Sequence, residues 1–477
     1  MAVDQAVTNE VAREADWPEL MESRDGRLFL DGCAIDDLAQ TFGTPLWVAS
    51  LRGIEHNYRR FVDAWEARYP QIECHYSIKA NHTLEIVRTL QRAGGRFDCT
   101  GEAELQIALM SGAAPERIVL NGNGKSPAAL RLAAELGIRQ VNIDSIGEAE
   151  RLNEAALAAG TVSDCVVRLQ LGYNDLLAND ASYESTLKIW EGKFGVAVGT
   201  CEAERVIAYI RDAPGLRFCG LHHHLAFSGV AGDYTIEIET GHHRDVMREI
   251  CAFARRIEGS LGVTVERIDC GGGFASGDGI FMVTPGNAGD GTMHALPAID
   301  RYIDAVSGPV REAFAEDRLP ILQFETGRYQ VAKDVVLVTR VSDVKDGHSD
   351  PPRRFVTCDS SMQQFTAKGF QKVAHQVVHA TRADDPANGK LADVVGQTCA
   401  YDSSCEDVYL PDVEPGDLLV MTGQGAYCDT SGTNFNAMTR PGTAVVRDGR
   451  AALAKRHETL MDIVSRHAGP SLDWQDV

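Results

Sequence analysis

No apolar run in the sequence reaches the roughly 18 residues that a membrane-spanning helix needs. The first residues also lack a basic start followed by an apolar core, so we expect no secretory signal peptide. Residues 1–22 are instead polar and acidic, and we expect them to form a flexible arm. These absences predict a protein without a membrane partner.

Positive charge is also scarce, because 46 Lys and Arg residues stand against 68 Asp and Glu residues and leave a net charge of −22. A chain this acidic is repelled by the phosphates of nucleic acids and of anionic lipid surfaces. We therefore predict that nucleic acid is not a partner.

Regular cysteine spacing is missing too, since the twelve cysteines include no CxxC pair. This scatter argues against a disulfide framework and against a zinc ribbon. It is typical of reduced thiols in a cytoplasmic protein, which is the localisation that we predict.

A chain of 477 residues with 44% hydrophobic and 24% charged residues is typical of a soluble protein with two domains. Short apolar runs alternate with helical patterns, which predicts parallel βα units, and eight of them predict a closed (β/α)8 TIM barrel. We place this barrel at residues 50–325. The predicted strands are His75–Ile78, Arg96–Cys99, Arg117–Leu120, Gln140–Ile143, Cys165–Leu171, Leu216–His222, Glu266–Asp269 and Ile321–Phe324.

The alternation stops after Arg328, and the later strand patterns have no long helices between them. They predict a C-terminal antiparallel β domain over residues 326–477. Within residues 23–49, two short strand patterns flank a helical pattern, and we expect these strands to pack with the C-terminal domain. The later strand patterns are Val331–Val341, Arg354–Thr357, Leu418–Thr422 and Thr443–Arg447.

Polar residues and glycines gather at the ends of the predicted barrel strands, where the active site of such a barrel lies. Lys79 follows the first strand, Asp98 lies at the end of the second, and three histidines (222–224) end the sixth. Gly271–Gly273 follow the seventh strand, and Glu325-Thr326-Gly327-Arg328 follow the eighth. Successive glycines let backbone N–H groups approach a phosphate, and an arginine adds charge. These two loops predict a phosphate site.

A lysine opposite a phosphate site and a carboxylate indicates pyridoxal 5'-phosphate (PLP), because a lysine amine forms a Schiff base with its aldehyde. PLP withdraws electrons when an acidic partner keeps its pyridine nitrogen protonated. Glu325 is our candidate for that partner.

Eight ordered motifs resemble the fold-type III PLP decarboxylases, the group of diaminopimelate, ornithine and D-ornithine/D-lysine decarboxylases, whose barrel is shared with alanine racemase. The resemblance extends from residue 27 to residue 466. It implies PLP-dependent decarboxylation of a basic or diamino acid, L or D, or of a related conjugate. The motifs are HYSIKAN, RFDCTGEAEL, KFGV, GLHHHL, IDCGGGF, ETGR, SSCEDVYLP and GQGAYCDTSGTNFN.

The resemblance also implies roles for individual residues. Lys79 would hold PLP, with Asp98 and Glu104 close to it. His224 would stack on the ring, and Glu325 would pair with the pyridine nitrogen. The phosphate ligands would be Gly271, Gly272, Gly273, Gly327, Arg328 and Tyr427.

Cys405 and Glu406 match a Cys-Glu pair that the family contributes across a dimer interface. Cys405 would protonate the carbanion left after CO₂ departs, and Glu406 would bind the substrate amine. The resemblance therefore implies a homodimer with composite active sites. Glu406 and Asp407 favour a basic side chain by charge complementarity, and Arg328 and Tyr427 complete the predicted substrate site.

Some positions depart from the family pattern. Gly-Ser usually follows the strand-six histidine, whereas Ala-Phe-Ser stands here, so we expect Ser228 to be a displaced phosphate contact. The diaminopimelate enzymes have an arginine and a tyrosine where Ala367 and Gln371 stand. Lys368 could replace that arginine only as a point charge. We therefore predict that meso-diaminopimelate is not the substrate.

Alternatives stay open at this point. A racemase on the same barrel would use Lys79 and Tyr427 as opposed proton carriers, but such racemases usually have an arginine where Glu325 stands. A non-catalytic homologue would be expected to lose the cofactor lysine. The histidines could form a metal cluster, but neighbours on a strand face opposite sides, so we predict no metal. Cys405 could be a small buried hydrophobe.

Overall fold

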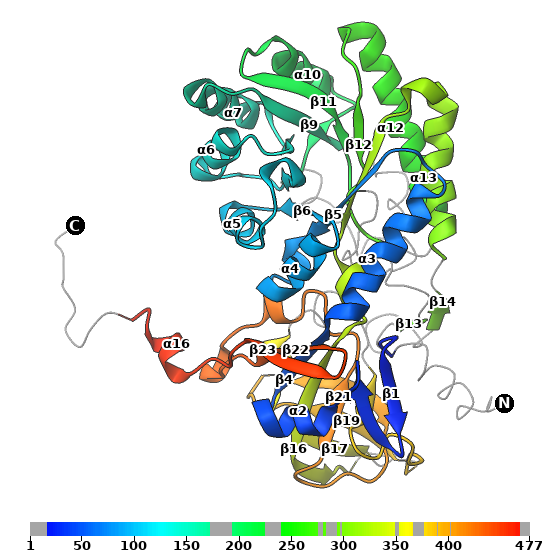
Figure 1. Cartoon of the computed structure of the whole chain (residues 1–477), viewed down its shortest axis with the longest axis vertical. Helices are drawn as coiled ribbons and strands as arrows, with labels where there is room; N and C mark the ends of the chain where they lie inside the picture. Colours follow the sequence, from blue (N-terminus) through cyan, green and yellow to red (C-terminus); the bar gives the residue numbers. More distant parts are fainter. Residues whose placement is uncertain are drawn as a thin grey trace. The chain divides into compact units, whose positions relative to one another are not determined.

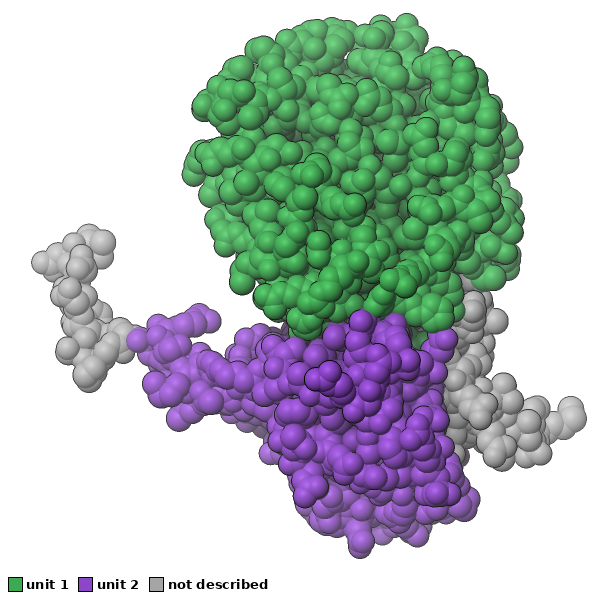
Figure 2. Space-filling model, viewed as in Figure 1, with its two compact units in different colours: residues 1–16, 53–333, 370–373 green, residues 17–52, 334–369, 374–477 purple. Residues whose placement is uncertain are grey.

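The structure is a computed structural model whose described residues form two compact units (Figures 1 and 2). Unit 1 comprises residues 53–333, and unit 2 comprises residues 17–52 and the described residues from 334 onward. The described residues are 17–171, 193–224, 240–274, 280–282, 293–295, 298–348, 353–365, 376–388, 390–400 and 402–467. Among their helices, none is long and apolar enough to cross a membrane.

Unit 1 is built on a parallel sheet that closes on itself. The strand order is β9-β11-β12-β15-β5-β6-β7-β8, and β8 pairs with β9 to complete the circle. The predicted (β/α)8 barrel is therefore confirmed. Its strands are β5 (Ile72–Ser77), β6 (Arg96–Cys99), β7 (Ile118–Leu120), β8 (Gln140–Ile143), β9 (Ser163–Gln170), β11 (Leu216–His222), β12 (Arg267–Asp269) and β15 (Ile321–Thr326), with the short β10 (Val196–Ala197) beside β9.

Helices alternate with these strands, as the labels in Figure 1 show. Local sequence sets their ends: the Ser126 side chain caps α6 at Ala129 N (3.0 Å), and Gly137 ends it in the left-handed region (φ 61°). The helices are α3 (Leu51–Glu66), α4 (Leu84–Arg92), α5 (Glu102–Met110), α6 (Pro127–Leu136), α7 (Ile146–Ala159), α10 (Glu202–Asp212), α12 (Thr240–Leu261), α13 (Ile299–Ala313) and α14 (Arg328–Val331). A hairpin of β13 (Ile280–Met282) and β14 (Met293–Ala295) interrupts them.

Polar side chains fill the barrel interior at the amino-terminal ends of the strands. Gln323 Nε2 donates to Glu73 Oε2 (2.7 Å) and to Gln140 Oε1 (2.9 Å). Arg267 Nη2 donates to Asp164 Oδ2 (3.0 Å). All of these bonds join different strands, so this end of the barrel interior is closed by a packed layer of polar side chains. The candidate site lies at the opposite, carboxyl-terminal end of the strands.

Unit 2 is a mainly antiparallel β structure. Its large sheet has the order β20-β19-β17-β16-β4-β22-β23, and β21 joins β16 to β18. The pairs β17–β19 and β22–β4 are parallel, so the predicted antiparallel domain is mixed at these two places. The strands are β4 (Leu46–Ser50), β16 (Val335–Asp346), β17 (Arg353–Cys358), β18 (Val377–His379), β19 (Leu391–Val395), β20 (Ser403–Tyr409), β21 (Leu418–Met421), β22 (Gly442–Arg447) and β23 (Arg450–Lys455), followed by α16 (Leu460–Val464).

The unit boundaries differ by a few residues from those expected from sequence. Met21 and Glu22 are not part of an arm, because β1 (Met21–Arg24) pairs with β2 (Arg27–Leu30), which leads to β3 (Cys33–Ala34) and α2 (Ile35–Phe42). Unit 1 extends past residue 325, because α14 follows β15 directly and buries Tyr329 against Phe61 (5.1 Å between ring centroids).

A buried ion pair braces the loops at the carboxyl ends of β7 and β8. Lys125 Nζ donates to Glu148 Oε1 (2.7 Å), to Gly122 O (2.6 Å) and to Asn142 O (2.6 Å). The side chains of Lys125 and Glu148 are 0% and 1% exposed. Glu148 Oε1 also accepts Asp144 N–H (3.1 Å), so one lysine ties three segments together.

We predict that Lys125→Met destabilises the protein by about 3–5 kcal/mol, because it leaves the Glu148 carboxyl buried without its cation. Arg92→Met is the matched control, since Arg92 is 61% exposed in its pair with Glu85 and should contribute less than about 1 kcal/mol. Urea unfolding of both variants measures the difference. Equal unfolding midpoints would contradict a bracing role for Lys125.

Candidate active site

Lys79 lies in a single helical turn, η1 (Ile78–Ala80), immediately after β5. Its Nζ is 3.2 Å from Asp98 Oδ2, because the register of β5 and β6 pairs Ser77 with Asp98. Ser77 Oγ donates to the same carboxylate oxygen (2.9 Å). Burial alone would raise the pKa of Asp98, but the Lys79 ammonium and the Ser77 hydroxyl outweigh it and lower that pKa. Asp98 is therefore ionised and holds the lysine.

Glu325, near the end of β15, is 3% exposed and faces polar groups from three other strands. Asn121 Nδ2 donates to its Oε1, and Asn142 Nδ2 and His222 Nε2 each lie 3.4 Å from the same atom. Oε2 accepts no N–H or O–H group of a described residue, although the Asp269 carboxyl lies close enough to share a proton with Glu325. The protein's amide donors thus gather at one oxygen of this buried carboxyl.

The charge state of this cluster follows from its burial. Burial and the neighbouring carboxyls of Asp269 and Asp98 raise the pKa of Glu325 well above its usual value. Burial also raises the pKa of Asp269 to about 6. His222 is likewise buried, and its pKa falls well below the usual value, so its imidazole is neutral. The carboxyls hold a proton readily, which suits an acid partner for a ring nitrogen.

The glycine run after β12 is shaped by close contacts. Gly271 has φ 66°, and a Cβ there would lie 2.6 Å from His224 Cα. Its N–H donates to Asp269 Oδ1 (3.1 Å) and its carbonyl accepts Glu325 N–H (2.7 Å). Gly271 therefore shapes the loop, and its N–H group already has an acceptor within the protein. The N–H groups of Gly272 and Gly273 donate no hydrogen bond to any described residue, and these fit a phosphate.

The three histidines have separate environments. His222 faces Glu325 inside the barrel, whereas His223 Nδ1 lies 3.0 Å from Leu169 O. His224 is half-buried against Gly271. Ligand atoms of His222, Asp269 and Glu325 lie within 4.8 Å of one another, a spacing that a metal site could also have. Asn142 and Asn121 already donate to the two carboxyls, so this cluster suits a hydrogen-bonding ring nitrogen better than an ion.

Other predicted barrel residues have clear positions. Gly327 and Arg328 begin α14 at the carboxyl end of β15, and Arg328 is half-buried. Glu104 Oε2 accepts Thr100 N–H (2.7 Å), and burial raises the pKa of Glu104. Glu104 thus stabilises the start of α5. Ser228, Ala367, Lys368 and Gln371 lie outside the described residues.

The remaining predicted residues belong to unit 2. Cys405 is buried on β20, and Tyr427 adopts φ 65°, a strained conformation for a non-glycine residue that often marks a functional position. Asp407, which was predicted to bind the substrate, has ion-pair partners within unit 2. Its Oδ1 is 2.5 Å from Arg353 Nη2, and Arg353 also pairs with Asp393 (2.6 Å), so the Asp407 charge is used within the sheet.

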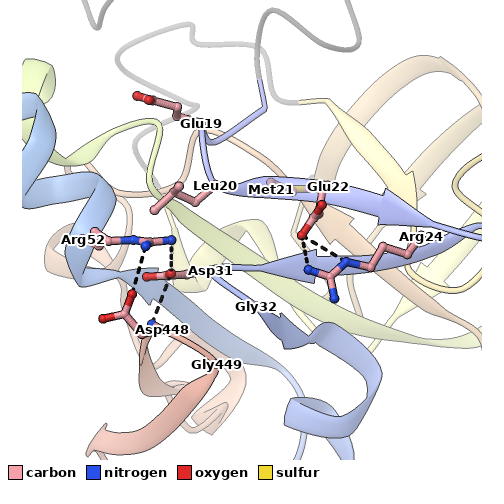
Figure 3. Close-up of a pocket in the computed structure, with 10 residues that line it drawn as sticks. All are labelled: Glu19, Leu20, Met21, Glu22, Arg24, Asp31, Gly32, Arg52, Asp448 and Gly449. Carbon is pink, nitrogen blue, oxygen red and sulfur yellow. Dashed lines mark hydrogen bonds and ion pairs between the residues drawn. The ribbon is translucent and has the colours of Figure 1, made fainter.

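A pocket of about 370 Å³ lies in unit 2 (Figure 3). Arg52 pairs there with the buried Asp31 (2.7 Å) and with Asp448 (2.9 Å), as the dashed lines in Figure 3 show. Both arginines of this pocket, Arg24 and Arg52, are already paired with carboxylates of its lining, so we assign no ligand to it.

Sequence reasoning missed three buried side chains of the site. Asn121, Asn142 and Asp269 receive no role from the sequence. Their signal was the placement of polar residues inside short apolar strands, where a side chain must face the barrel interior. Asp144 does serve its loop, since its Oδ1 accepts Gly195 N–H (2.8 Å).

A pH dependence follows from His75, which is 0% exposed on β5 and pairs in register with Glu325. Burial lowers its pKa from 6.5 to about 4. The unfolded state thus binds an extra proton between these values, so stability should fall by about 3 kcal/mol as pH drops from 6.5 to 4.

The His75→Gln variant should lose this part of the pH dependence, because glutamine does not titrate. Urea midpoints measured from pH 7 to pH 4 test the difference between the variant and the wild type. His56→Gln, at an exposed position of α3, is the control and should follow the wild type. Parallel curves for His75→Gln and the wild type would show that His75 is not neutral in the fold.

Three neighbouring strands of the barrel thus contribute to one site. Lys79 follows β5, the buried acid Glu325 lies on β15, and the glycine run follows β12. This arrangement is that of a PLP-binding barrel enzyme. Comparison with known proteins identifies the family. The model of the pyridoxal-dependent decarboxylases, pyridoxal-binding domain, matches residues 55–332. The chain belongs to this family of pyridoxal-dependent decarboxylases.

Relatives match the chain over nearly its whole length. A diaminopimelate decarboxylase of Actinosynnema pretiosum is 32% identical, covering 96% of this chain and 97% of its own. That of Pseudomonas aeruginosa is 31% identical over 94% and 98%. The crystal structure of the Methanocaldococcus jannaschii enzyme in complex with L-lysine has a TM-score of 0.80 at 27% identity, covering 95% of this chain and 98% of that one. These matches confirm the predicted fold, family and cofactor.

Proposed function

We propose that this protein removes the carboxylate of a diamino acid with the help of PLP. The observation that best supports the proposal is the charged pair of Lys79 and Asp98 beside the buried, half-satisfied carboxyl of Glu325. Similar chains with the name diaminopimelate decarboxylase support the same reaction type.

Each site residue has a task in this proposal. Lys79 would hold PLP, and His224 would lie against the face of its ring. The phosphate of PLP would be bound by Gly272, Gly273, Gly327, Arg328 and Tyr427. When bound, PLP draws electrons away from the bond between Cα and the carboxylate. Asp98 would keep the Lys79 amine in place. Glu325 would hold a proton at Oε2 that it could share with the ring nitrogen.

Two kinds of diamino acid are candidate substrates. The names of the relatives favour diaminopimelate, which has a second carboxylate. Ala367 and Gln371 stand where those enzymes have an arginine and a tyrosine, which favours lysine or ornithine. The Glu406 carboxylate would bind an amine of the substrate, either the distal amine or the α-amine, by opposite charge.

We predict CO₂ from one diamino acid in a panel of L- and D-ornithine, L- and D-lysine, arginine, glutamate and meso-diaminopimelate. Lys79→Ala should abolish CO₂ release and the fixing of PLP by borohydride, because the Schiff base needs that amine. Lys345→Ala, at a 73% exposed lysine, is the control. PLP fixed to the wild type without CO₂ from any substrate would contradict decarboxylation, and racemisation of the same panel would then identify a racemase.

We also propose a homodimer in which Cys405 and Glu406 of a second copy complete each site. Cys405 would deliver the proton that replaces the carboxylate, and Glu406 would bind an amine. This part rests on the family pattern and on the burial of Cys405 within β20. All twelve cysteines are described and free of disulfides, which supports a reduced, cytoplasmic setting.

Mixing two inactive variants tests the composite site. Lys79→Ala and Cys405→Ala should each be inactive in amine formation, whereas a refolded equimolar mixture should regain about a quarter of wild-type activity. Half of the dimers would be mixed, and each mixed dimer would have one intact site. The Cys399→Ala variant, at an exposed cysteine, is the control for Cys405→Ala. A mixture as inactive as its parents would contradict sharing of the site.

A further inference from the structure

Two buried asparagines point their amide N–H groups at the carboxyls of the site. Asn121, directly after β7, is 3% exposed, and Asn142, in β8, is 1% exposed. Asn121 Nδ2 donates to Glu325 Oε1. Asn142 Nδ2 donates to Asp269 Oδ2 (3.0 Å) and lies 3.4 Å from Glu325 Oε1. Neither asparagine has a role in the function proposed above.

The orientation of each amide is set by a donor on its oxygen side. Asn121 Oδ1 accepts Gly122 N–H (2.8 Å), and Asn142 Oδ1 accepts Gln140 Nε2 (2.9 Å). An amide whose oxygen is used in this way must turn its NH₂ group to the other side. Both asparagines are therefore donors toward the carboxyls. Glu325 Oε1 must remain an acceptor, so a proton on Glu325 can lie only on Oε2.

The backbones of the two asparagines are also held. Asn121 N–H donates to Cys99 O (2.8 Å). Lys125 Nζ binds the carbonyls of Gly122 and Asn142 together (2.6 Å each). Gly122 has φ 86°, and a Cβ on it would lie 2.8 Å from Thr100 Cγ2, which restricts the turn further. The two donors thus belong to a rigid frame at the end of β7 and β8.

We propose that Asn121 and Asn142 are positioning residues that saturate Oε1 of Glu325 and leave Oε2 as its only proton-sharing atom toward the PLP ring nitrogen. The proposal rests on the cofactor role of Glu325 proposed above. The asparagines act through Glu325 and need not touch the cofactor themselves.

The two asparagine donors would also influence how a proton is shared between Glu325 Oε2 and the ring nitrogen of bound PLP. N–H donors stabilise the ionised form of a carboxyl, whereas burial and the Asp269 carboxyl oppose that form. The two donors limit how far burial raises the pKa of Glu325, and loss of the Asn121 donor would raise that pKa further. With PLP bound, the shared proton would then reside more on Oε2 and less on the ring nitrogen. The charged or titratable groups that face Glu325 are Asp98, Asp269, His222, Arg168 and Lys79.

The experiment measures the protonation of the ring nitrogen directly, by the ¹⁵N chemical shift of ¹⁵N-labelled PLP bound to the holoenzyme. Asn121→Leu is the main variant, because leucine has a similar branched shape and no donor. Asn123→Ala is the matched control: Asn123 lies in the same loop, is exposed, and donates to Lys193 O (3.2 Å). Asn121→Ser is a milder second variant.

We expect the wild type and Asn123→Ala to show a protonated ring nitrogen. Asn121→Leu should shift the signal toward neutral pyridine and lower kcat by about tenfold to a hundredfold, the usual effect of losing a hydrogen bond to a charged group, with little change in KM. Asn121→Ser should shift the signal in the same direction and by less. Circular dichroism and the PLP content show that each variant is folded and loaded.

Two outcomes separate this inference from the proposed function. A folded, loaded Asn121→Leu or Asn121→Ser protein with the wild-type ¹⁵N shift would overturn the positioning role, even if the enzyme decarboxylates. A wild type that releases no CO₂ would overturn the proposed function. If its ring nitrogen still responds to Asn121→Leu, the positioning role stands by itself.

Discussion

The closed barrel removes Glu325 from water, and the polar groups around the site compensate for that burial. A buried carboxyl without partners costs several kcal/mol, and only hydrogen bonds or an opposite charge offset this cost. Asn121, Asn142 and His222 approach one oxygen and leave the other open. In the proposed function, the ring nitrogen of the cofactor would be the partner of the second oxygen. The asymmetry of the donors around Glu325 is the feature of the site that supports this proposal.

Strand pairing links this acid to the lysine. β15, β5 and β6 are neighbours in the barrel, so Glu325 and Asp98 approach the site from either side of the strand that leads to Lys79. Ser77 Oγ makes the connection physical, because it lies within hydrogen-bond distance of both Asp98 Oδ2 (2.9 Å) and the Glu325 carbonyl (3.1 Å). A change at any of these strands would alter both ends of the cofactor site together.

Unit 2 depends on pairing between distant parts of the chain. β4 lies between β16 and β22, so residues 46–50 are held by residues 335–338 and 442–446. The sheet can be completed only when almost the whole chain is available. Within it, the ion pairs of Arg353 fix Asp407 next to the Cys405–Glu406 segment. Cys405, predicted to be catalytic, and Glu406, predicted to bind the substrate, thus lie on a strand that ion pairs stabilise.

The sequence by itself determined the alternation of strands and helices, the glycine run, Lys79 and Glu325, because periodicity and backbone requirements act locally along the chain. It also led to the family through ordered motifs. Only the tertiary structure decided that Asn121 and Asn142 donate to Glu325, that Asp269 takes the Gly271 N–H, and that Arg353 neutralises Asp407. The physical reason is that such hydrogen bonds and ion pairs join strands far apart in sequence, and barrel closure and strand register determine which side chains meet.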